Sequence, residues 1–379
     1  MQNPESLTDR ELLYDPLFET PPDTEIRDIP GRGFWGKAAV RKTVFVLFLC
    51  LFVGASIALS FSSLSKPRFR YGEADGGREL SEFTPGKTDA VLEIGPVFDA
   101  DGAPVPDETV VSVRTFAVCC NEVTSVALIG PTVREIPNTA FFSCSGLIAA
   151  LVDPANPYFR SVGGCLYRQQ DGRLTELMLC PAKSYLYRAL LSLGETPPDT
   201  AESAEAFAAR AAALEEKSAD WLKEQKKDEP DGGLHGLTAA EAKALQRGLT
   251  LQIEPGVTRI GELAAAECEA LFELGLPEGV TEIASMAFYK CAGLRLLTLP
   301  DSLESLGSDA FSYCERLSSV FIPAGVKRIG HHAFFGCSGV DEVCLAAAES
   351  EAPETGQDWL PKKRKLFERD VPVVYGVER

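Results

Sequence analysis

The chain has 379 residues, of which 45% are hydrophobic, and a formal net charge of −18 at pH 7. This length suffices for two ordinary domains or for one elongated array of repeats. The acidity argues against nucleic acid as a partner, because phosphate binding needs a basic face, and solubility accounts for the acidity instead.

The first two predicted segments are a tail and a membrane span. Residues 1–42 are rich in Pro, Asp, Glu and Thr without a sustained period, which predicts a disordered tail. Residues 43–61, TVFVLFLCLFVGASIALSF, contain no charge. A helix rises about 1.5 Å per residue, so this segment can cross a hydrocarbon core of roughly 30 Å. We predict a transmembrane helix that is not cleaved, since a long polar stretch precedes it.

Basic residues flank the apolar segment on both sides, with a small excess before it. They are Arg32, Lys37, Arg41 and Lys42 before the segment, and Lys66, Arg68 and Arg70 after it. The positive-inside rule therefore favours a cytoplasmic N-terminus. We predict a single-pass protein of the cell membrane, with a cytoplasmic tail and an extracellular domain.

Residues 62–109 are rich in Ser, Pro, Gly and Asp. This composition predicts a stalk or linker that holds the following domain away from the membrane. The run AVLEIGPVFD, at 90–99, could supply one strand near the end of the stalk. Ordered structure is expected to begin near Val110.

A repeat of 23 residues dominates the second half of the chain, where cysteine recurs at Cys268, Cys291, Cys314 and Cys337. An aliphatic residue stands a few positions before each of these cysteines, and another follows three positions after it. Self-similarity at a fixed period of about 20–50 residues is typical of a stacked-repeat fold.

Each repeat is predicted to form one coil of a solenoid. Residues 294–300 read L-x-x-L-x-L-P, in which the alternation predicts a strand and the proline ends it. Residues 285–291, on the opposite side, have helical or tight-turn character. The strands of successive coils are expected to join in one parallel sheet, and the cysteines to fill the core as small apolar groups.

The repeat is predicted to run over 110–182 and again over 249–345. In the first part, Ile136, Ala140, Cys144 and Leu147 have the spacing of the later repeats, and an irregular repeat follows them. The C-terminal segment, 346–379, is predicted to be a loop followed by a strand at 371–377 that closes the stack.

Residues 183–248 interrupt the repeat and predict a helical insertion. Phe207, Leu214 and Trp221 recur every seven residues, so one helical face is apolar. Capping boxes are expected at Asp199 with Glu202 and at Thr238 with Glu241. The insertion either projects from the stack or packs along one side of it.

The repeat resembles the leucine-rich repeat family, specifically the BspA-like class of bacterial and protist surface proteins. IPAGVKRIGHHAFFGCSGVDEVCL, LPDSLESLGSDAFSYCERLSSVFIP and LPEGVTEIASMAFYKCAGLRLLTLP carry the resemblance. It covers about 110–182 and 249–345, and it implies a right-handed solenoid displayed outside the cell and used for adhesion or protein binding. The predicted fold class is thus an α/β repeat solenoid, a leucine-rich repeat stack with a parallel β-sheet, a helical insertion and one N-terminal transmembrane helix.

The candidate binding site is the strand face, which is concave in such a stack, at the positions between the repeated leucines. These residues are Phe272, Glu273, Arg295, Leu296, Thr298, Ser318, Ser319, Phe321, Asp341 and Glu342. Exposed apolar groups beside charges are typical of a protein-binding surface. The alternative is that the insertion covers some of them or that they are simply scattered.

Residue types that carry chemistry form no recognisable set. The three histidines belong to no Ser/His/Asp or Cys/His arrangement, and no CxxC pair or Cys/His ligand set is present. We therefore expect no enzyme, no metal and no cofactor. His331 and His332 are interpreted as two variable turn positions, and a disulfide from Cys119 or Cys120 stays open.

Two functional hypotheses follow. The first is a membrane-anchored, surface-displayed repeat protein that binds a protein or a surface polymer through its strand face. The second is a membrane-anchored signalling or scaffold component whose N-terminal tail docks a cytoplasmic partner.

Overall fold

The structure is a computed structural model that describes residues 67–87, 89–227, 232–360 and 371–378. All of these belong to one compact unit, Ser63–Arg379. The predicted tail at 1–42 and the predicted transmembrane helix at 43–61 lie outside the described residues. Within the described ranges, no helix is both long enough and apolar enough to cross a membrane.

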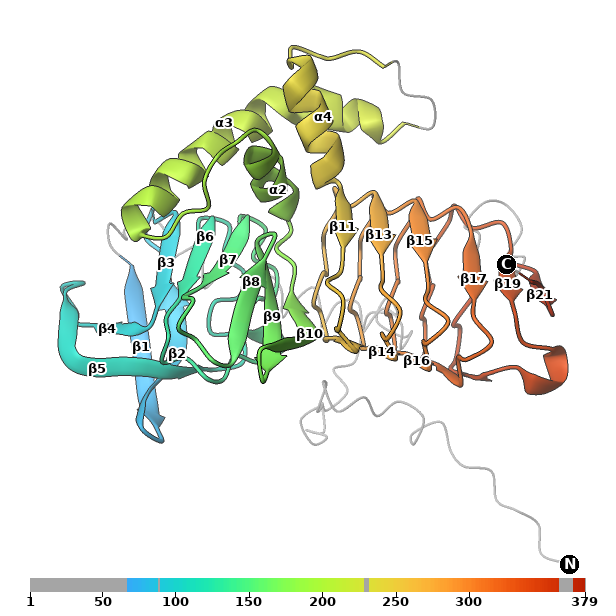
Figure 1. Cartoon of the computed structure of the whole chain (residues 1–379), viewed down its shortest axis with the longest axis horizontal. Coiled ribbons are helices and arrows are strands. Elements are labelled where there is room, and N and C mark those ends of the chain that lie inside the picture. Colours follow the sequence, from blue (N-terminus) through green and yellow to red (C-terminus); the bar gives the residue numbers. More distant parts are fainter. Residues whose placement is uncertain (1–66, 88, 228–231, 361–370, 379) are drawn as a thin grey trace, which may run out of the picture. The chain divides into compact units, whose positions relative to one another are not determined.

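The repeated coils stack as predicted, but each coil carries two short strands rather than one (Figure 1). On one side lie β11 (Thr250–Gln252), β13 (Glu273–Gly275), β15 (Leu296–Thr298), β17 (Val320–Ile322), β19 (Val343–Leu345) and β21 (Val373–Tyr375). We call this side the strand face. Its strands are parallel and form two sheets, β11-β13-β15 and β17-β19-β21. The prediction of a single parallel sheet is therefore wrong.

A second ladder runs along the other side of the coils. It contains β12 (Arg259–Ile260), β14 (Glu282–Ile283), β16 (Ser305–Leu306), β18 (Arg328–Ile329) and β20 (Glu354–Thr355). Parallel pairing joins the isoleucine or leucine of each coil to its counterpart, for example Ile260 to Ile283. The sequence hid these strands because each is only two residues long, too short for any alternation to appear.

The segment predicted as helix or tight turn is a tight turn. Met286 and Lys290 have φ values of 55° and 57°, which break any helix. Between them the backbone N–H groups of Met286, Phe288 and Lys290 each donate to a carbonyl of the next coil at 2.8 Å. The turns thus form a third hydrogen-bonded ladder beside the two strand ladders.

The core of the stack repeats with the coils. The rings of Phe288, Phe311 and Phe334 are fully buried and stack in parallel, with centroids 5.1 and 5.5 Å apart. The repeated cysteines lie beside them as predicted, but they do more than fill space. The Cys291 thiol donates to the Ala265 carbonyl at 3.1 Å, and the Cys314 thiol donates to the Phe288 carbonyl at 3.3 Å. Each thiol therefore binds a buried carbonyl of the preceding coil.

The region predicted as a stalk, 62–109, is ordered from residue 67 onward, which corrects that prediction. It contains β1 (Arg68–Ala74), β2 (Gly77–Thr84), β3 (Val91–Ile94), β4 (Pro96–Phe98) and most of β5 (Pro104–Val113). β1, β2, β5 and β4 form a sheet, and β3 pairs with the first strand of the stack.

These N-terminal strands cap the solenoid. Leu80 and Phe83 are buried in the same core as the first coils, and the Phe69 ring lies 5.1 Å from the Phe83 ring. The Phe83 N–H donates to the Ala117 carbonyl at 2.7 Å. In this bond the cap takes the place that a preceding coil would have in a longer stack. The end of a solenoid has to be shielded from water, and polar residues on the outer side of this cap gave the segment a linker-like composition.

The first coils and the irregular repeat contain β6 (Val126–Ile129), η2 (Asn138–Phe141), β7 (Ala149–Val152), β8 (Phe159–Val162), β9 (Cys165–Gln170) and β10 (Arg173–Leu179). β8, β9 and β10 are antiparallel neighbours. Asn156 fixes the irregular loop, because its side-chain amide donates to the Gly130 and Val133 carbonyls, both at 2.8 Å.

The insertion consists of α2 (Ser184–Ser192), α3 (Ala201–Gln225) and α4 (Ala239–Gly248). α4 has the predicted capping box of Thr238 and Glu241. The hydrogen bond from Lys217, together with the bonds of the capping box, lowers the pKa of Glu241 to about 2. The cap predicted at Asp199 is wrong by one residue, since Thr200 and Ser203 form the box of α3. Serine replaces the glutamate of the usual box there.

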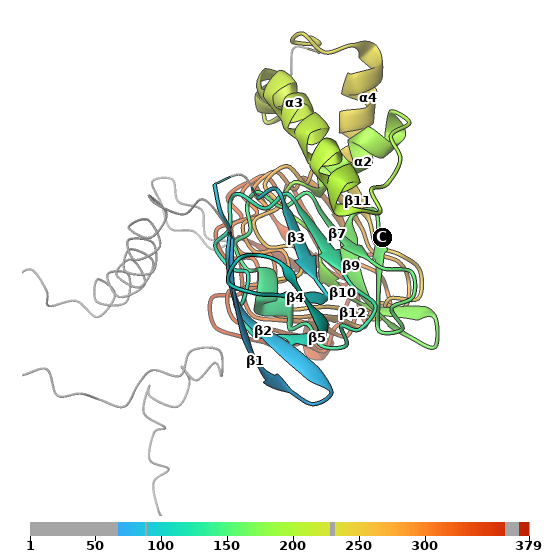
Figure 2. The ribbon, with the colours of Figure 1, turned by 90° about the vertical axis from the view of Figure 1, so that its left-hand side faces the viewer.

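The insertion sits inside one coil. β10 pairs with β12 through Leu177 and Ile260, and β11 pairs with β13 through Leu251 and Leu274. The two halves of the coil therefore flank residues 183–248. Figures 1 and 2 show the three helices gathered on one side of the stack.

The insertion packs along the stack rather than projecting from it. The predicted stripe of Phe207, Leu214 and Trp221 is buried in one cluster with Val126 and Ala149 of the first coils. This pairing is expected, because an apolar helix face and an apolar outer sheet face cover each other from water.

Candidate binding surface on the strand face

Strand pairing aligns the outward side chains of the strand face in rows. Leu296 lies beside Glu273, and Thr298 lies beside Gly275. Farther along, Phe321 pairs with Cys344, and Cys344 pairs with Val374. Because side chains alternate across a strand, these residues point away from the core, as the sequence analysis predicts.

The predicted site residues fall into two groups. Leu296, Thr298, Ser318, Ser319, Asp341 and Glu342 are exposed, while Phe272, Glu273, Arg295 and Phe321 are partly buried. Leu296 is the most exposed large hydrophobic residue of the described ranges, at 51%. A single exposed leucine is ordinary, so the candidate rests on the apolar residues that lie on the same face as Leu296.

The insertion covers one end of the predicted site. Phe272 packs against the cluster that contains Phe207 and Trp221, and the Arg295 guanidinium lies 5.8 Å from the Phe272 ring centre. The alternative of partial cover therefore holds for Phe272. We use the name open strand face for five of the other predicted residues: Leu296, Thr298, Ser319, Phe321 and Glu342.

One residue that the sequence analysis did not select extends this surface. Val374 of β21 is 40% exposed and lies in the row of Phe321. The terminal strand was predicted, but its register against β19 could not be read from sequence, because residues 346–370 separate it from the repeat.

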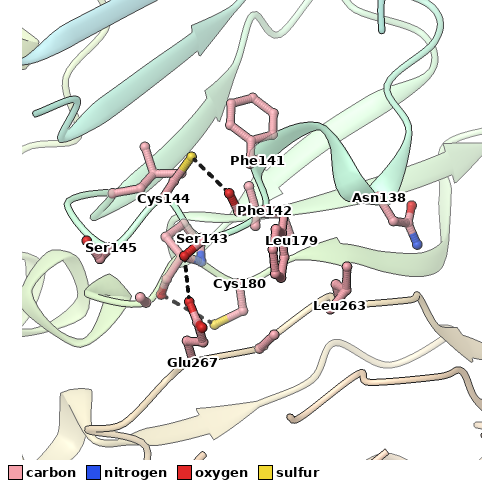
Figure 3. A pocket seen from close by; sticks show the side chains of 14 residues that line it. Asn138, Phe141, Phe142, Ser143, Cys144, Ser145, Leu179, Cys180, Leu263 and Glu267 are labelled. Carbon is pink, nitrogen blue, oxygen red and sulfur yellow. Dashed lines mark hydrogen bonds between the residues drawn. The ribbon is translucent and has the colours of Figure 1, made fainter. Parts of the chain in front are cut away.

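A small pocket marks the join between the first coils and the later stack (Figure 3). Its volume is about 20 Å³, and the Ser143 hydroxyl spans it to donate to Glu267 at 3.0 Å. This space holds about one water molecule, so it is a packing seam and not a ligand site.

A larger pocket of about 480 Å³ lies between α3 and the turns of the stack. Opposite charges meet across it: Lys183 contacts Glu215 at 2.8 Å, and Lys226 contacts Glu269 at 3.8 Å. These pairs tie the helix to the coils. In the part of the chain that the structure describes, no group of three His, Cys, Asp or Glu side chains is placed to hold a metal ion.

The two histidines on the turns do not act together. His331 Nδ1 accepts the Gln357 N–H at 2.8 Å, whereas the His332 ring lies 5.3 Å from the Phe335 ring. The first therefore helps to fix the last coil, and the second joins an aromatic contact on the surface.

Cys119 and Cys120 are both free thiols, the first half-buried and the second exposed. The hydrogen bond from Cys119 lowers the pKa of Cys120 to about 7. Burial raises the pKa of Cys291 and Cys314 well above the usual thiol value. The thiolate is the reactive form, so these environments predict opposite reactivities.

We expect Cys120 to be alkylated by iodoacetamide in the native protein while Cys291 and Cys314 react only after unfolding. The rate at Cys120 should rise with a midpoint near pH 7, because the thiolate forms above the pKa. Mass spectrometry of peptides sampled over time measures both. Cys119→Ala should move the midpoint upward, and an unchanged midpoint would contradict the assigned hydrogen bond.

Comparison with known proteins bears on the repeats. Residues 248–350 match the family model described as the BspA type leucine-rich repeat region, in six copies. This confirms the resemblance for the repeats at 249–345, whereas the match does not include the repeats predicted at 110–182. No curated protein sequence matches the chain.

Several solved structures are similar to the chain at low sequence identity. The pneumococcal vaccine antigen PcpA is 15% identical, with a TM-score of 0.45, over 74% of this chain and 54% of that one. A leucine-rich cell surface protein from Faecalibacterium prausnitzii is 13% identical, with a TM-score of 0.41, over 82% and 94%. A leucine-rich repeat protein from Bacteroides ovatus is 19% identical, with a TM-score of 0.32, over 78% and 67%. The chain thus spans about half the length of the pneumococcal antigen.

Proposed function

Because residues 248–350 are a BspA-type leucine-rich repeat region, we propose that the chain is a surface-displayed binding protein. Its open strand face receives another protein, or a polymer of a cell surface. In this proposal residues 43–61 anchor the chain in the membrane, the tail at 1–42 is cytoplasmic, and the repeats face outward.

The observation that carries the proposal is the apolar surface at Leu296, which is 51% exposed and whose strand pairs with β13. Phe321 and Val374 extend the apolar surface, and Asp341 and Glu342 lie at its edge. An apolar centre with a charged rim is the usual composition of a protein contact. A rigid backbone also lowers the entropy lost on binding.

A matched pair of leucine substitutions tests the proposal. Leu296→Arg places a charge on the open strand face, whereas Leu193→Arg places one at a leucine that is 38% exposed beyond the end of α2. The full chain is immobilised and exposed to surface proteins and surface polymers of intact cells. We expect a retained partner to bind Leu193→Arg normally and Leu296→Arg at least about tenfold more weakly, since central contact residues dominate affinity.

If both variants retain the partner equally well, the strand face is not the binding surface. If neither the variants nor the parent chain retain any partner, the proposed binding function is wrong. Protease treatment of intact cells tests the orientation separately. Cleavage within the repeats is the expected result, and protection of the repeats in cells with an intact membrane would reverse the proposed topology.

A further inference from the structure

A pocket of about 450 Å³ lies at the end of the strand face where the insertion rejoins the stack. It is lined by the β8–β9 hairpin, α2, the end of α4 and β11. The side chains that matter for its chemistry are Tyr167, Arg188, Arg247, Thr250, Gln252 and Glu254. Two arginines against one glutamate make this a locally cationic site in a chain whose net charge is −18.

Arg188 is held rigidly and is incompletely bonded. Its Nε and Nη2 donate to the Gly248 carbonyl at the end of α4, at 3.1 and 2.6 Å. Its Nη1 is buried and has no hydrogen-bond partner among the described residues. A buried N–H normally has an acceptor, so Nη1 is the incompletely bonded group of this guanidinium.

Arg247, in the last turn of α4, supplies the second guanidinium of the pocket. Among the residues that the structure describes, neither arginine forms an ion pair with a carboxylate. Other arginines near the stack do form such pairs, for example Arg168 with Glu176 at 3.1 Å. The arginine pair of this pocket is therefore available to an anion from outside.

The floor of the pocket continues into the strand face. Thr250 and Gln252 are the outward residues of β11, and Gln252 lies in the row of Gly275 and Thr298. The Gln252 side chain extends over Gly275, where a Cβ atom would lie 1.9 Å from its Oε1. The pocket and the open strand face therefore lie along one row of outward residues.

We propose that this pocket binds a carboxylate group through Arg188 and Arg247. The inference rests on the proposed function and deepens it: the group would be the terminal carboxylate of a peptide chain that lies on the strand face, or that of a small free acid. Guanidinium groups match the planar carboxylate in shape and charge. With Glu254 beside them, the two arginines carry a net charge that one carboxylate balances.

Isothermal titration calorimetry on the full chain, with defined probes, tests the site. The probes are acetyl-alanyl-alanine, its C-terminal amide, acetate and inorganic phosphate. We expect the dipeptide acid to bind at least about tenfold more tightly than the amide, as charge-assisted hydrogen bonds predict. Acetate that binds as well as the dipeptide identifies a small acid as the ligand, and weaker binding by acetate identifies a peptide end.

Arginine variants complete the design. Arg247→Gln should weaken the dipeptide acid at least about fivefold, and Arg188→Lys should do the same because lysine cannot form the fork. Arg173→Gln, an exposed arginine at the start of β10, should leave binding unchanged. Since Arg247 is exposed, its substitution leaves folding intact even if the Arg188 variant disturbs α4.

Three results would overturn the proposal: equal binding of acid and amide, equal loss in the Arg247 and Arg173 variants, or preference for phosphate. Leu296→Arg separates the site from the strand face. If the dipeptide binds that variant normally, the pocket acts by itself. A failed pocket with an intact Leu296 effect leaves the proposed function standing.

Discussion

Replacing Phe311 by alanine is expected to destabilise the repeat region by about 3–5 kcal/mol, the range for a fully buried phenylalanine. Its ring lies between those of Phe288 and Phe334, at centroid distances of 5.1 and 5.5 Å. The substitution therefore removes two stacking contacts and leaves a cavity that the flanking coils cannot close. Backbone hydrogen bonds fix the spacing of those coils, for instance from the Phe311 N–H to the Ala333 carbonyl at 2.8 Å.

Urea unfolding followed by circular dichroism measures the loss. Phe116→Ala is the matched control, because this phenylalanine is 48% exposed and its ring makes one edge contact, with Phe142 at 6.1 Å. We expect the control to lose less than about 1.5 kcal/mol. A comparable loss in both variants would mean that the stacked rings do not hold the coils together.

The periodic part of the fold was predictable because the same residue types recur at the same positions of every repeat, and these positions show which side chains are buried. Cys291, Leu294 and Phe288 recur at fixed positions, and all three are buried as the period requires. The thiol hydrogen bonds were not predictable, since a buried cysteine reads as a small apolar group until the carbonyl opposite it is known. The two-residue strands were missed for a similar reason, as their pairing partner lies one coil away.

The N-terminal cap was missed because its pattern is not repeated. Leu80 and Phe83 face the core, but β2 reads GRELSEFT, in which charged residues dominate the composition. Only the end of the solenoid, an edge that has to be covered, explains why such a strand is ordered. Composition alone therefore predicted a linker.

The candidate surface was predictable in its direction but not in its extent. Alternation along the strands placed Leu296 and Phe321 outward, whereas the burial of Phe272 depends on where α3 packs. The arginine pocket could not be predicted, because Arg188 and Arg247 lie far apart in the sequence and both belong to the insertion. The signal was present only as one basic residue in the middle of α2 and another in the last turn of α4.

Replacing Phe207 by alanine is expected to release the insertion without unfolding the later coils. Phe207 is fully buried and lies 5.2 Å from the Tyr187 ring, so its truncation costs about 3–5 kcal/mol. The loss should not reach the later coils, because the insertion shares a hydrophobic cluster with the first coils while the later coils have a separate core, and a solenoid transmits stability only between neighbours. Phe311→Ala should instead destabilise the later coils and leave the insertion folded.

Hydrogen exchange read by mass spectrometry distinguishes these outcomes. In Phe207→Ala, the amides of α3 and α4 should exchange faster, while those of Phe288 and Phe311 keep their protection. Glu216→Ala, on the exposed side of α3, should change neither region. Equal loss of protection in both regions would show that the insertion and the later coils unfold as one unit.

Local unfolding of the insertion should also be detected as a loss of binding at the carboxylate pocket, because Arg188 and Arg247 are positioned by α2 and α4. Phe207→Ala should therefore abolish dipeptide binding in a chain whose open strand face still holds its partner.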